Sequence, residues 1–249
     1  MKYINYSPDL WAQINKSIDR ALQQDSTPVA AFDADGTLWD LDMGEVFFQY
    51  LIDHKLVPLP EDAFDRYEKM KKDIAGPQKA YLWLAQVMKG VELKVVREWA
   101  SKSLVAMGPL PYFPEQKKLI ELFTSRGVKV YIVTASVKWA VEPGTAIFGL
   151  PYEQVLGIET ESEGGIVTDR QKGPITYRQG KAEALLKVTG GKKPFFSAGN
   201  TFGDLALLEL STDVKLAVTS TVPDDRLFRS EQELFNEATQ RGWSKHRFN

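Results

Sequence analysis

A short apolar run that ends in two aspartates constrains this chain more than any other feature. Residues 29–40 read VAAFDADGTLWD, so Val29–Phe32 is followed at once by Asp33 and Asp35 and then by a Gly-Thr pair. Such a run is typical of a buried strand in a parallel sheet, and Asp-Gly marks the turn that leaves it. Ligands of open α/β sheets gather where strands end, and a divalent cation would relieve the repulsion between two carboxylates there. The motif therefore predicts a site, although an ordinary turn with Asp35 as a helix cap has the same sequence.

Apolar runs alternate with amphipathic helical patterns along much of the remaining chain. Besides Val29–Phe32, strands are expected at Val128–Val133, Pro194–Ser197 and Lys215–Val218, with a hairpin formed by Val155–Ile158 and Ile166–Thr168. Helices are expected at Ser7–Gln24, Glu115–Arg126, Trp139–Phe148, Tyr177–Val188, Leu205–Leu210 and Asp224–Thr239. Strands that alternate with helices imply right-handed βαβ units. We therefore predict an α/β fold, a Rossmann-like parallel sheet flanked by helices.

The segment from Glu45 to Met107 has a different sequence pattern from the rest of the chain. It shows no β-like alternation, and prolines and glycines separate helical patterns at Val46–His54, Glu61–Asp73, Gln78–Met88 and Leu93–Val105. We predict an all-helical cap of residues 45–107, inserted into a Rossmann-like catalytic core of residues 1–44 and 108–249.

Composition excludes several classes of function. The formal net charge is −2 without a basic run, which argues against nucleic-acid binding, and no apolar stretch reaches the ~20 residues of a membrane span. The N-terminal residues lack the apolar centre of a signal peptide, so we expect a cytoplasmic protein. We expect either a monomer or a small homo-oligomer. Cysteine is absent and histidine occurs only at positions 54 and 246, which disfavours thiolate chemistry and histidine-based sites. Carboxylates must therefore carry any acid–base chemistry.

Polar side chains follow the other predicted core strands as well. Thr134 and Ser136 come after the second strand, Asn200 and Asp204 after the third, and Lys181 lies in the helix before that third strand. An aspartate can attack phosphorus, Mg²⁺ prefers carboxylate and other oxygen ligands, and a hydroxyl and an ammonium can hold phosphoryl oxygens. Together the set is suited to phosphoryl transfer.

Four segments resemble the motifs of the haloacid dehalogenase superfamily of phosphatases. These are DADGT, the Thr of VYIVT, the Lys of RQGKAEAL, and GNTFGD, which occur in the family's order and span the chain. A helical insertion directly after the first motif is similar to the phosphoserine-phosphatase-like branch, whose cap closes over small substrates. The resemblance implies a Mg²⁺-dependent phosphomonoesterase that acts on a small phosphorylated metabolite through an aspartyl-phosphate.

The resemblance also implies roles for individual residues. Asp33 matches the nucleophile, and Asp35 matches the general acid/base that protonates the leaving oxygen and then activates water. Thr134 matches the phosphate-binding hydroxyl, which Ser136 would assist, and Lys181 matches the charge-neutralising lysine.

The same motifs imply a metal site. Asn200 and Asp204 match the metal-binding pair, and Asp33 and the backbone carbonyl of Asp35 complete the protein ligands. Many family members carry Asp where this chain has Asn200, so the site has one negative charge fewer. From the sequence alone, Asn200→Asp is therefore expected to strengthen Mg²⁺ binding.

Aromatic and acidic residues around the start of the insertion suggest a substrate class. Most of the aromatic side chains are expected in the core of the cap. If a few face the site together with Asp42 and Glu45, they could hold an ammonium group by cation–π and charge contacts. This favours phosphoserine or an amino-alcohol phosphate such as phosphocholine, between which the sequence does not choose.

Other phosphate-binding classes fit less well. A P-loop is disfavoured because six residues separate Gly173 from Gly180-Lys181 and Ala182 replaces the required Ser or Thr. A metal-free dehalogenase of the same superfamily would lack a carboxylate at the Asp35 position. The alternative function is a non-catalytic phospho-accepting or phosphate-binding signalling module, although receiver domains resemble a chain half this long without a helical insertion.

Overall fold

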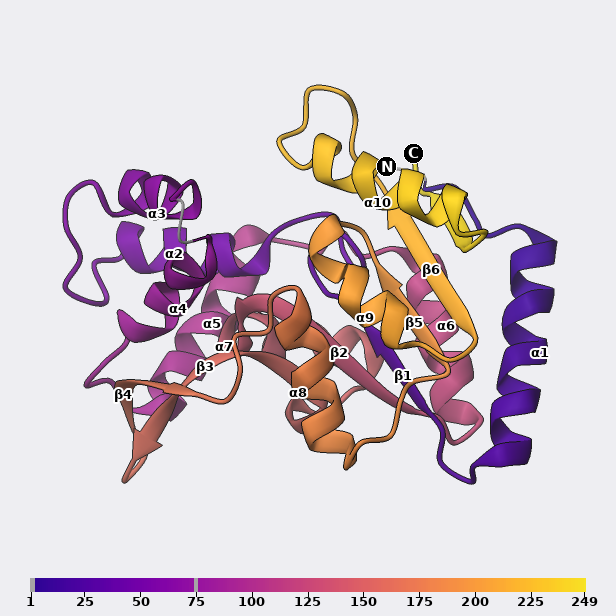
Figure 1. Ribbon diagram of the computed structural model, residues 1–249. Coiled ribbons are helices and arrows are strands. Elements are labelled where there is room, and N and C mark those ends of the chain that lie inside the picture. Colours follow the sequence, from indigo (N-terminus) through magenta and orange to yellow (C-terminus); the bar gives the residue numbers. More distant parts are fainter. Residues whose placement is uncertain (1–2, 74–75) are drawn as a thin grey trace. The chain divides into compact units, whose positions relative to one another are not determined.

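The computed structural model describes residues 3–73 and 76–249, and these form a seven-stranded sheet in the order β4-β3-β2-β1-β5-β6-β7 (Figure 1). The strands are β1 (Val29–Phe32), β2 (Lys129–Val137), β3 (Val155–Glu163), β4 (Ile166–Lys172), β5 (Phe196–Gly199), β6 (Val214–Thr219) and β7 (Ser244–Arg247). The α-helices are α1 (Pro8–Gln24), α2 (Met43–Asp53), α3 (Ala63–Lys71), α4 (Gln78–Gln86), α5 (Leu93–Met107), α6 (Pro114–Ser125), α7 (Lys138–Val141), α8 (Gln179–Thr189), α9 (Leu205–Leu210) and α10 (Phe228–Gln240). Short 3₁₀ helices are η1 (Glu142–Phe148), η2 (Tyr152–Gln154) and η3 (Phe202–Asp204).

The sheet is mostly parallel, which confirms the predicted fold class. β1 pairs in parallel with β2 and β5, β5 with β6, and β6 with β7, whereas β3 and β4 form an antiparallel hairpin. All four residues of β1 are buried, as expected of a central strand covered on both faces.

The register of β1 and β5 brings two predicted site segments to one edge of the sheet. Phe32 is opposite Ala198, and the backbone N–H of Asp33 continues the ladder by donating to the carbonyl of Ala198 at 2.9 Å. Because these strands are parallel, the residues that follow each of them emerge at the same edge. Asp33 and Asn200 therefore start from neighbouring positions.

The chain divides into two compact units. The first comprises Met1–Leu41, Pro111–Val133 and Arg178–Asn249, and the second comprises Asp42–Leu110 and Thr134–Tyr177. In the second unit, side chains of the inserted helices share one apolar core with Trp139, Ile158 and Val167. The predicted boundaries of a separate cap, 45–107, stay a prediction, and residues 74–75 within them lie outside the described residues.

One local prediction was wrong, and one strand was missed. The predicted helix Trp139–Phe148 is a short α7 followed by the 3₁₀ helix η1, because Pro143 and Gly144 disfavour a continuous α-helix there. β7 was not predicted: its sequence, SKHR, lacks a run of strand-forming residues, and the strand forms by pairing with β6.

None of the helices in residues 3–73 and 76–249 has the length and apolar character that a bilayer-spanning segment needs.

Candidate active site

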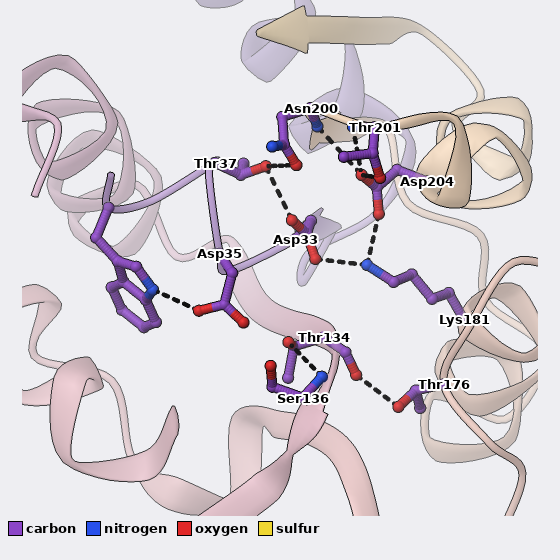
Figure 2. A network of polar contacts seen from close by, with 11 residues as sticks. Asp33, Asp35, Thr37, Thr134, Ser136, Thr176, Lys181, Asn200, Thr201 and Asp204 are labelled. Atoms are coloured by element: carbon purple, nitrogen blue, oxygen red, sulfur yellow. Dashed lines mark hydrogen bonds and ion pairs between the residues drawn. The ribbon is translucent and has the colours of Figure 1, made fainter. Parts of the chain in front are cut away.

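A buried lysine bridges two carboxylates in the first unit (Figure 2). Asp33 directly follows β1, Lys181 lies in the first turn of α8, and Asp204 ends η3. The Lys181 ammonium Nζ is 2.5 Å from Asp33 Oδ1 and 2.5 Å from Asp204 Oδ1. These three residues are each at most 5% exposed. The two carboxylates and the ammonium leave one net negative charge in a place with little water.

This environment shifts the proton affinities of the cluster. Burial, followed by the negative charge of Asp204, raises the pKa of Asp33 from 3.8 to about 7, although Lys181 acts in the opposite direction. Burial alone would lower the pKa of Lys181, but Asp204 and Asp33 together raise it above its ordinary value. Lys181 is therefore held as an ammonium, while Asp33 carries the cost of an uncompensated buried charge.

The second oxygen of Asp204 fixes the loop that follows β5. Its Oδ2 accepts hydrogen bonds from the backbone N–H of Asn200 at 3.1 Å, and from the N–H and hydroxyl of Thr201 at 3.0 and 3.2 Å. Gly199 permits this close approach, because a Cβ atom there would lie 2.5 Å from Asp204 Cβ. The side chain of Asp204 thus fixes the backbone of the GNTFGD segment to which it belongs.

Thr37 connects the first motif to Asn200, a role that the sequence did not reveal. Its hydroxyl Oγ1 is 3.0 Å from Asp33 Oδ2 and 3.3 Å from Asn200 Oδ1, so its one hydrogen can be donated to either oxygen. The preceding Gly36 has φ 74°, and a Cβ atom there would lie 2.0 Å from Asn200 Nδ2. Only glycine satisfies both the turn and the contact. The third residue of the DGT segment could have signalled this role, because a threonine after a turn can reach back to the strand end.

These oxygens fit a hard divalent cation. Asp33, Asp204 and Asn200 offer carboxylate and amide oxygens, the donor types that Mg²⁺ prefers, and the cluster has a negative charge to be neutralised. Within residues 3–73 and 76–249, no group of three or more His, Cys, Asp or Glu side chains could hold a metal. The predicted set of Asp33, Asp204, Asn200 and the Asp35 carbonyl, which includes amide and backbone oxygens, stays a prediction.

Asp35 is oriented by a buried tryptophan. Its Oδ1 accepts a hydrogen bond from Trp39 Nε1 at 2.8 Å, and Trp39 is fully buried. The backbone N–H of Gly36 also donates to the carbonyl of Trp39 at 2.8 Å, which closes the turn. The half-buried Asp35 carboxylate is thus held in one direction, as a proton-transferring group requires.

The predicted phosphate-binding hydroxyls belong to the second unit. Thr134 continues β2 directly after Val133, the last residue of that stretch of the first unit. Thr134 Oγ1 accepts a hydrogen bond from the backbone N–H of Ser136 at 3.0 Å, and its carbonyl accepts one from the hydroxyl of Thr176 at 2.5 Å. These hydrogen bonds hold the last residues of β2 in place, while the contact of Thr134 and Ser136 with substrate stays a prediction.

The two acidic residues predicted to hold an ammonium are also in the second unit. Asp42 caps α2 and accepts a hydrogen bond from the backbone N–H of Glu45 at 2.9 Å. The Glu45 carboxylate is 2.9 Å from Nζ of Lys71, which lies 4.6 Å from the ring centroid of Tyr67. A carboxylate and an aromatic ring do hold an ammonium here, but this ammonium is the side chain of Lys71 and not part of a substrate. Recognition of a substrate ammonium by Asp42 or Glu45 stays a prediction.

Comparison with known proteins agrees with this architecture. The chain is similar in structure to a functionally unknown protein from Anaerococcus prevotii DSM 20548 (TM-score 0.72, 14% identity, covering 98% of this chain and 92% of that one). It is also similar to a protein of unknown function from Bordetella pertussis Tohama I (TM-score 0.68, 22% identity, 88% and 98% covered). A third similar structure is a phosphoserine phosphohydrolase-like protein from Francisella tularensis subsp. tularensis SCHU S4 (TM-score 0.55, 17% identity, 85% and 99% covered). At these identities the likeness establishes the fold.

Sequence comparison identifies the family. No curated protein matches the chain significantly. Residues 30–209, however, match the haloacid dehalogenase-like hydrolase family, and this range runs from β1 through α9 and includes the Asp33, Lys181 and Asp204 cluster. With the parallel sheet, the motifs at its strand ends and this match in agreement, the chain belongs to the haloacid dehalogenase-like hydrolases.

Proposed function

We propose that this protein is a Mg²⁺-dependent phosphomonoesterase that acts on a small phosphorylated metabolite through an aspartyl-phosphate at Asp33. The observation that carries the proposal is the buried ammonium of Lys181, 2.5 Å from both Asp33 and Asp204. A nucleophilic carboxylate needs such a partner, because two negatively charged groups, the carboxylate and the phosphate ester, must approach each other in the reaction.

The reaction proceeds in two displacements. A carboxylate oxygen of Asp33 forms a bond to phosphorus while the ester P–O bond breaks, and Asp35 gives its proton to the departing alcohol oxygen. Asp35 then takes a proton from water, whose oxygen attacks phosphorus and releases inorganic phosphate and the Asp33 carboxylate. The hydrogen bond from Trp39 keeps the Asp35 carboxyl group in one position for both proton transfers.

The proposed metal ligands are Asp33, Asp204, Asn200 and the backbone carbonyl of Asp35. When bound, Mg²⁺ neutralises charge on the phosphoryl oxygens. Lys181 neutralises charge between Asp33 and Asp204, and Thr37 donates a hydrogen bond to Asp33 Oδ2 that orients the carboxylate. Thr134 and Ser136 are proposed to hold the remaining phosphoryl oxygens.

The proposed substrate is phosphoserine or an amino-alcohol phosphate such as phosphocholine. Likeness to the phosphoserine phosphohydrolase-like protein from Francisella tularensis supports a small substrate of this kind. Asp42 and Glu45 are the carboxylates proposed to bind its ammonium group. Lys71 forms the ion pair with Glu45 when substrate is absent.

The experiment is a phosphate-release assay over an aryl phosphate and a panel of phosphorylated metabolites, with Mg²⁺ or with chelator. We expect turnover of the aryl phosphate, a preference for amine-bearing phosphates, and loss of both activities in chelator that added Mg²⁺ restores. Because uncatalysed phosphate-monoester hydrolysis is among the slowest reactions known, clear turnover is diagnostic. Undiminished activity without divalent metal would refute the mechanism, and stoichiometric phosphorylation without turnover would indicate the alternative, a phospho-accepting signalling module.

A further inference from the structure

A buried glutamate that the proposed reaction does not use lies behind the metal-binding motif. Glu231 is on the inner face of α10, in line with the core residues Leu234 and Ala238, and is 1% exposed. Its hydrogen-bond donors are neutral: one side-chain amide, two hydroxyls and two backbone N–H groups. Burial of a carboxylate among neutral donors is costly, and an apolar residue would suit the face of α10 better. The position of Glu231 therefore calls for a reason other than packing.

The two oxygens of Glu231 have separate partners. Oε2 accepts hydrogen bonds from the end of β6 and the segment after β6, namely from the Thr219 hydroxyl, the Ser220 N–H at 3.2 Å, and the N–H and hydroxyl of Thr221 at 3.2 and 2.6 Å. Oε1 accepts a hydrogen bond from Nδ2 of Asn200 at 2.8 Å. The segment after β6 thus anchors the carboxylate, and its remaining oxygen is aimed at one amide.

This contact decides which way the Asn200 amide faces. A carboxylate accepts hydrogen bonds and cannot donate them, so Glu231 binds Nδ2 and excludes the flipped amide. Oδ1 of Asn200 then points toward the Thr37 hydroxyl, 3.3 Å away, on the side of Asp33. Asn200 itself is 1% exposed, so water cannot replace Glu231 as the partner of its amide.

We propose that Glu231 is the positioning residue for the metal ligand Asn200, and that it supplies from behind the amide the negative charge that an aspartate at position 200 would carry. This inference rests on the proposed Mg²⁺ site. The hydrogen bond from Nδ2 to a carboxylate increases the electron density on the amide oxygen and so makes it a stronger ligand for a metal ion. Outer-shell acceptors have the same effect on metal-bound histidines. Asn200 and Glu231 are therefore one unit with a single negative charge.

The inference reverses the expectation drawn from the sequence alone. Asn200→Asp would place a second carboxylate where Nδ2 now lies 2.8 Å from Glu231, with no hydrogen to share between them. Two buried carboxylates at that distance repel each other, so the introduced aspartate turns away from its place and Mg²⁺ binding weakens despite the added charge.

A double-mutant cycle tests the pair. Mg²⁺ affinity is measured by calorimetry without substrate for the wild type, Asn200→Asp, Glu231→Gln and the double variant. We expect each single variant to bind Mg²⁺ about 10–100-fold more weakly, the usual cost of losing an outer-shell partner. In the double variant, the amide of the introduced glutamine can donate to the introduced aspartate while its oxygen still accepts from the segment after β6. The double variant should therefore recover affinity beyond either single variant.

Two controls separate positioning from folding. Glu115→Gln changes another buried glutamate that accepts a backbone N–H, from Tyr6 at 3.1 Å, and should alter thermal stability but not Mg²⁺ affinity. In an Asn200→Ala background, Glu231→Gln should leave Mg²⁺ affinity unchanged, because there is no amide left to orient. This second comparison decides the question if a single variant of the cycle fails to fold.

The outcomes distinguish this inference from the proposed function. If the wild type does not bind Mg²⁺, the proposed function fails. If the wild type binds Mg²⁺ but Asn200→Asp binds it more tightly, or if the two substitutions act additively, the function stands and the positioning role of Glu231 is overturned. Recovery in the double variant supports the pair.

Discussion

Substitution of the proposed nucleophile should stabilise the metal-free protein, and the gain should depend on pH. Burial and the charge of Asp204 raise the pKa of Asp33 from 3.8 to about 7. At about 1.36 kcal/mol per pKa unit, ionised Asp33 therefore costs the folded state about 4 kcal/mol. Asp33→Asn removes this charge and keeps an oxygen that can accept a hydrogen bond from Lys181.

The sign of the pH dependence follows from linkage. Below 3.8 the carboxyl group is protonated in both the folded and the unfolded chain, so ionisation of Asp33 adds no difference between wild type and variant. As the pH rises from 3.8, the unfolded chain loses this proton first, and wild-type stability falls until the folded carboxyl has ionised as well, above about 7. The advantage of Asp33→Asn should thus grow from near zero at about pH 4 to about 4 kcal/mol at about pH 8.

Urea unfolding of both proteins in chelator, at a series of pH values, measures this difference. The exposed carboxylate Asp224 provides a matched control, since Asp224→Asn makes the same chemical change in solvent. Added Mg²⁺ should then stabilise the wild type and not Asp33→Asn, since binding to the folded state alone raises stability by mass action. A stability difference between wild type and Asp33→Asn that stays constant from about pH 4 to 8 would refute the reasoning, because a packing effect does not titrate.

Three further predictions concern catalysis, specificity and acid stability. Asp35→Asn should lower kcat/KM, which reports the phosphorylation step, about 10²–10⁴-fold for an alkyl phosphate and less for an aryl phosphate, since a good leaving group needs no proton; equal losses in kcat/KM would contradict the acid role. Glu45→Gln should raise KM for an amino-alcohol phosphate about ten- to a hundredfold and spare the aryl phosphate; if Lys71→Met has the same effect, Glu45 acts only through its ion pair with Lys71. Burial lowers the pKa of His246 in the folded protein below its ordinary value of 6.5. The stability that the neutral ring contributes above pH 6.5 should therefore be lost as the pH falls through the pKa of His246 in the folded protein. His246→Gln should weaken that acid dependence in urea titrations, and an unchanged dependence would assign it to other groups.

The central strand and the motifs could be predicted because their signals are local. β1 has the predicted bounds, Val29–Phe32, since an uninterrupted apolar run between turn residues leaves few alternatives. Lys181 and Asp204 could be grouped with Asp33 from their positions around the strand ends and from the family resemblance, but nothing in a single helical lysine says which carboxylates it meets. The structure brings the three together, and their catalytic roles stay predictions.

Features that depend on tertiary contacts could not be predicted. β7 exists because β6 offers it an edge to pair with, and its own sequence is polar. Glu231 is distant in sequence from Asn200 and belongs to no motif. Its one local signal is an acidic residue on the apolar face of α10, which marks a buried charge but does not name its partner.

The central claim is that Asp33 becomes phosphorylated during turnover. The most direct measurement is mass spectrometry of the protein after rapid acid quenching, with Asp35→Asn and an aryl phosphate so that the intermediate forms and persists. We predict a phosphoryl group on the peptide that contains Asp33, only when Mg²⁺ is present, and none when Asp33→Asn is combined with Asp35→Asn. Steady hydrolysis with no phosphoryl group on that peptide, or with the group on another residue, would contradict the account.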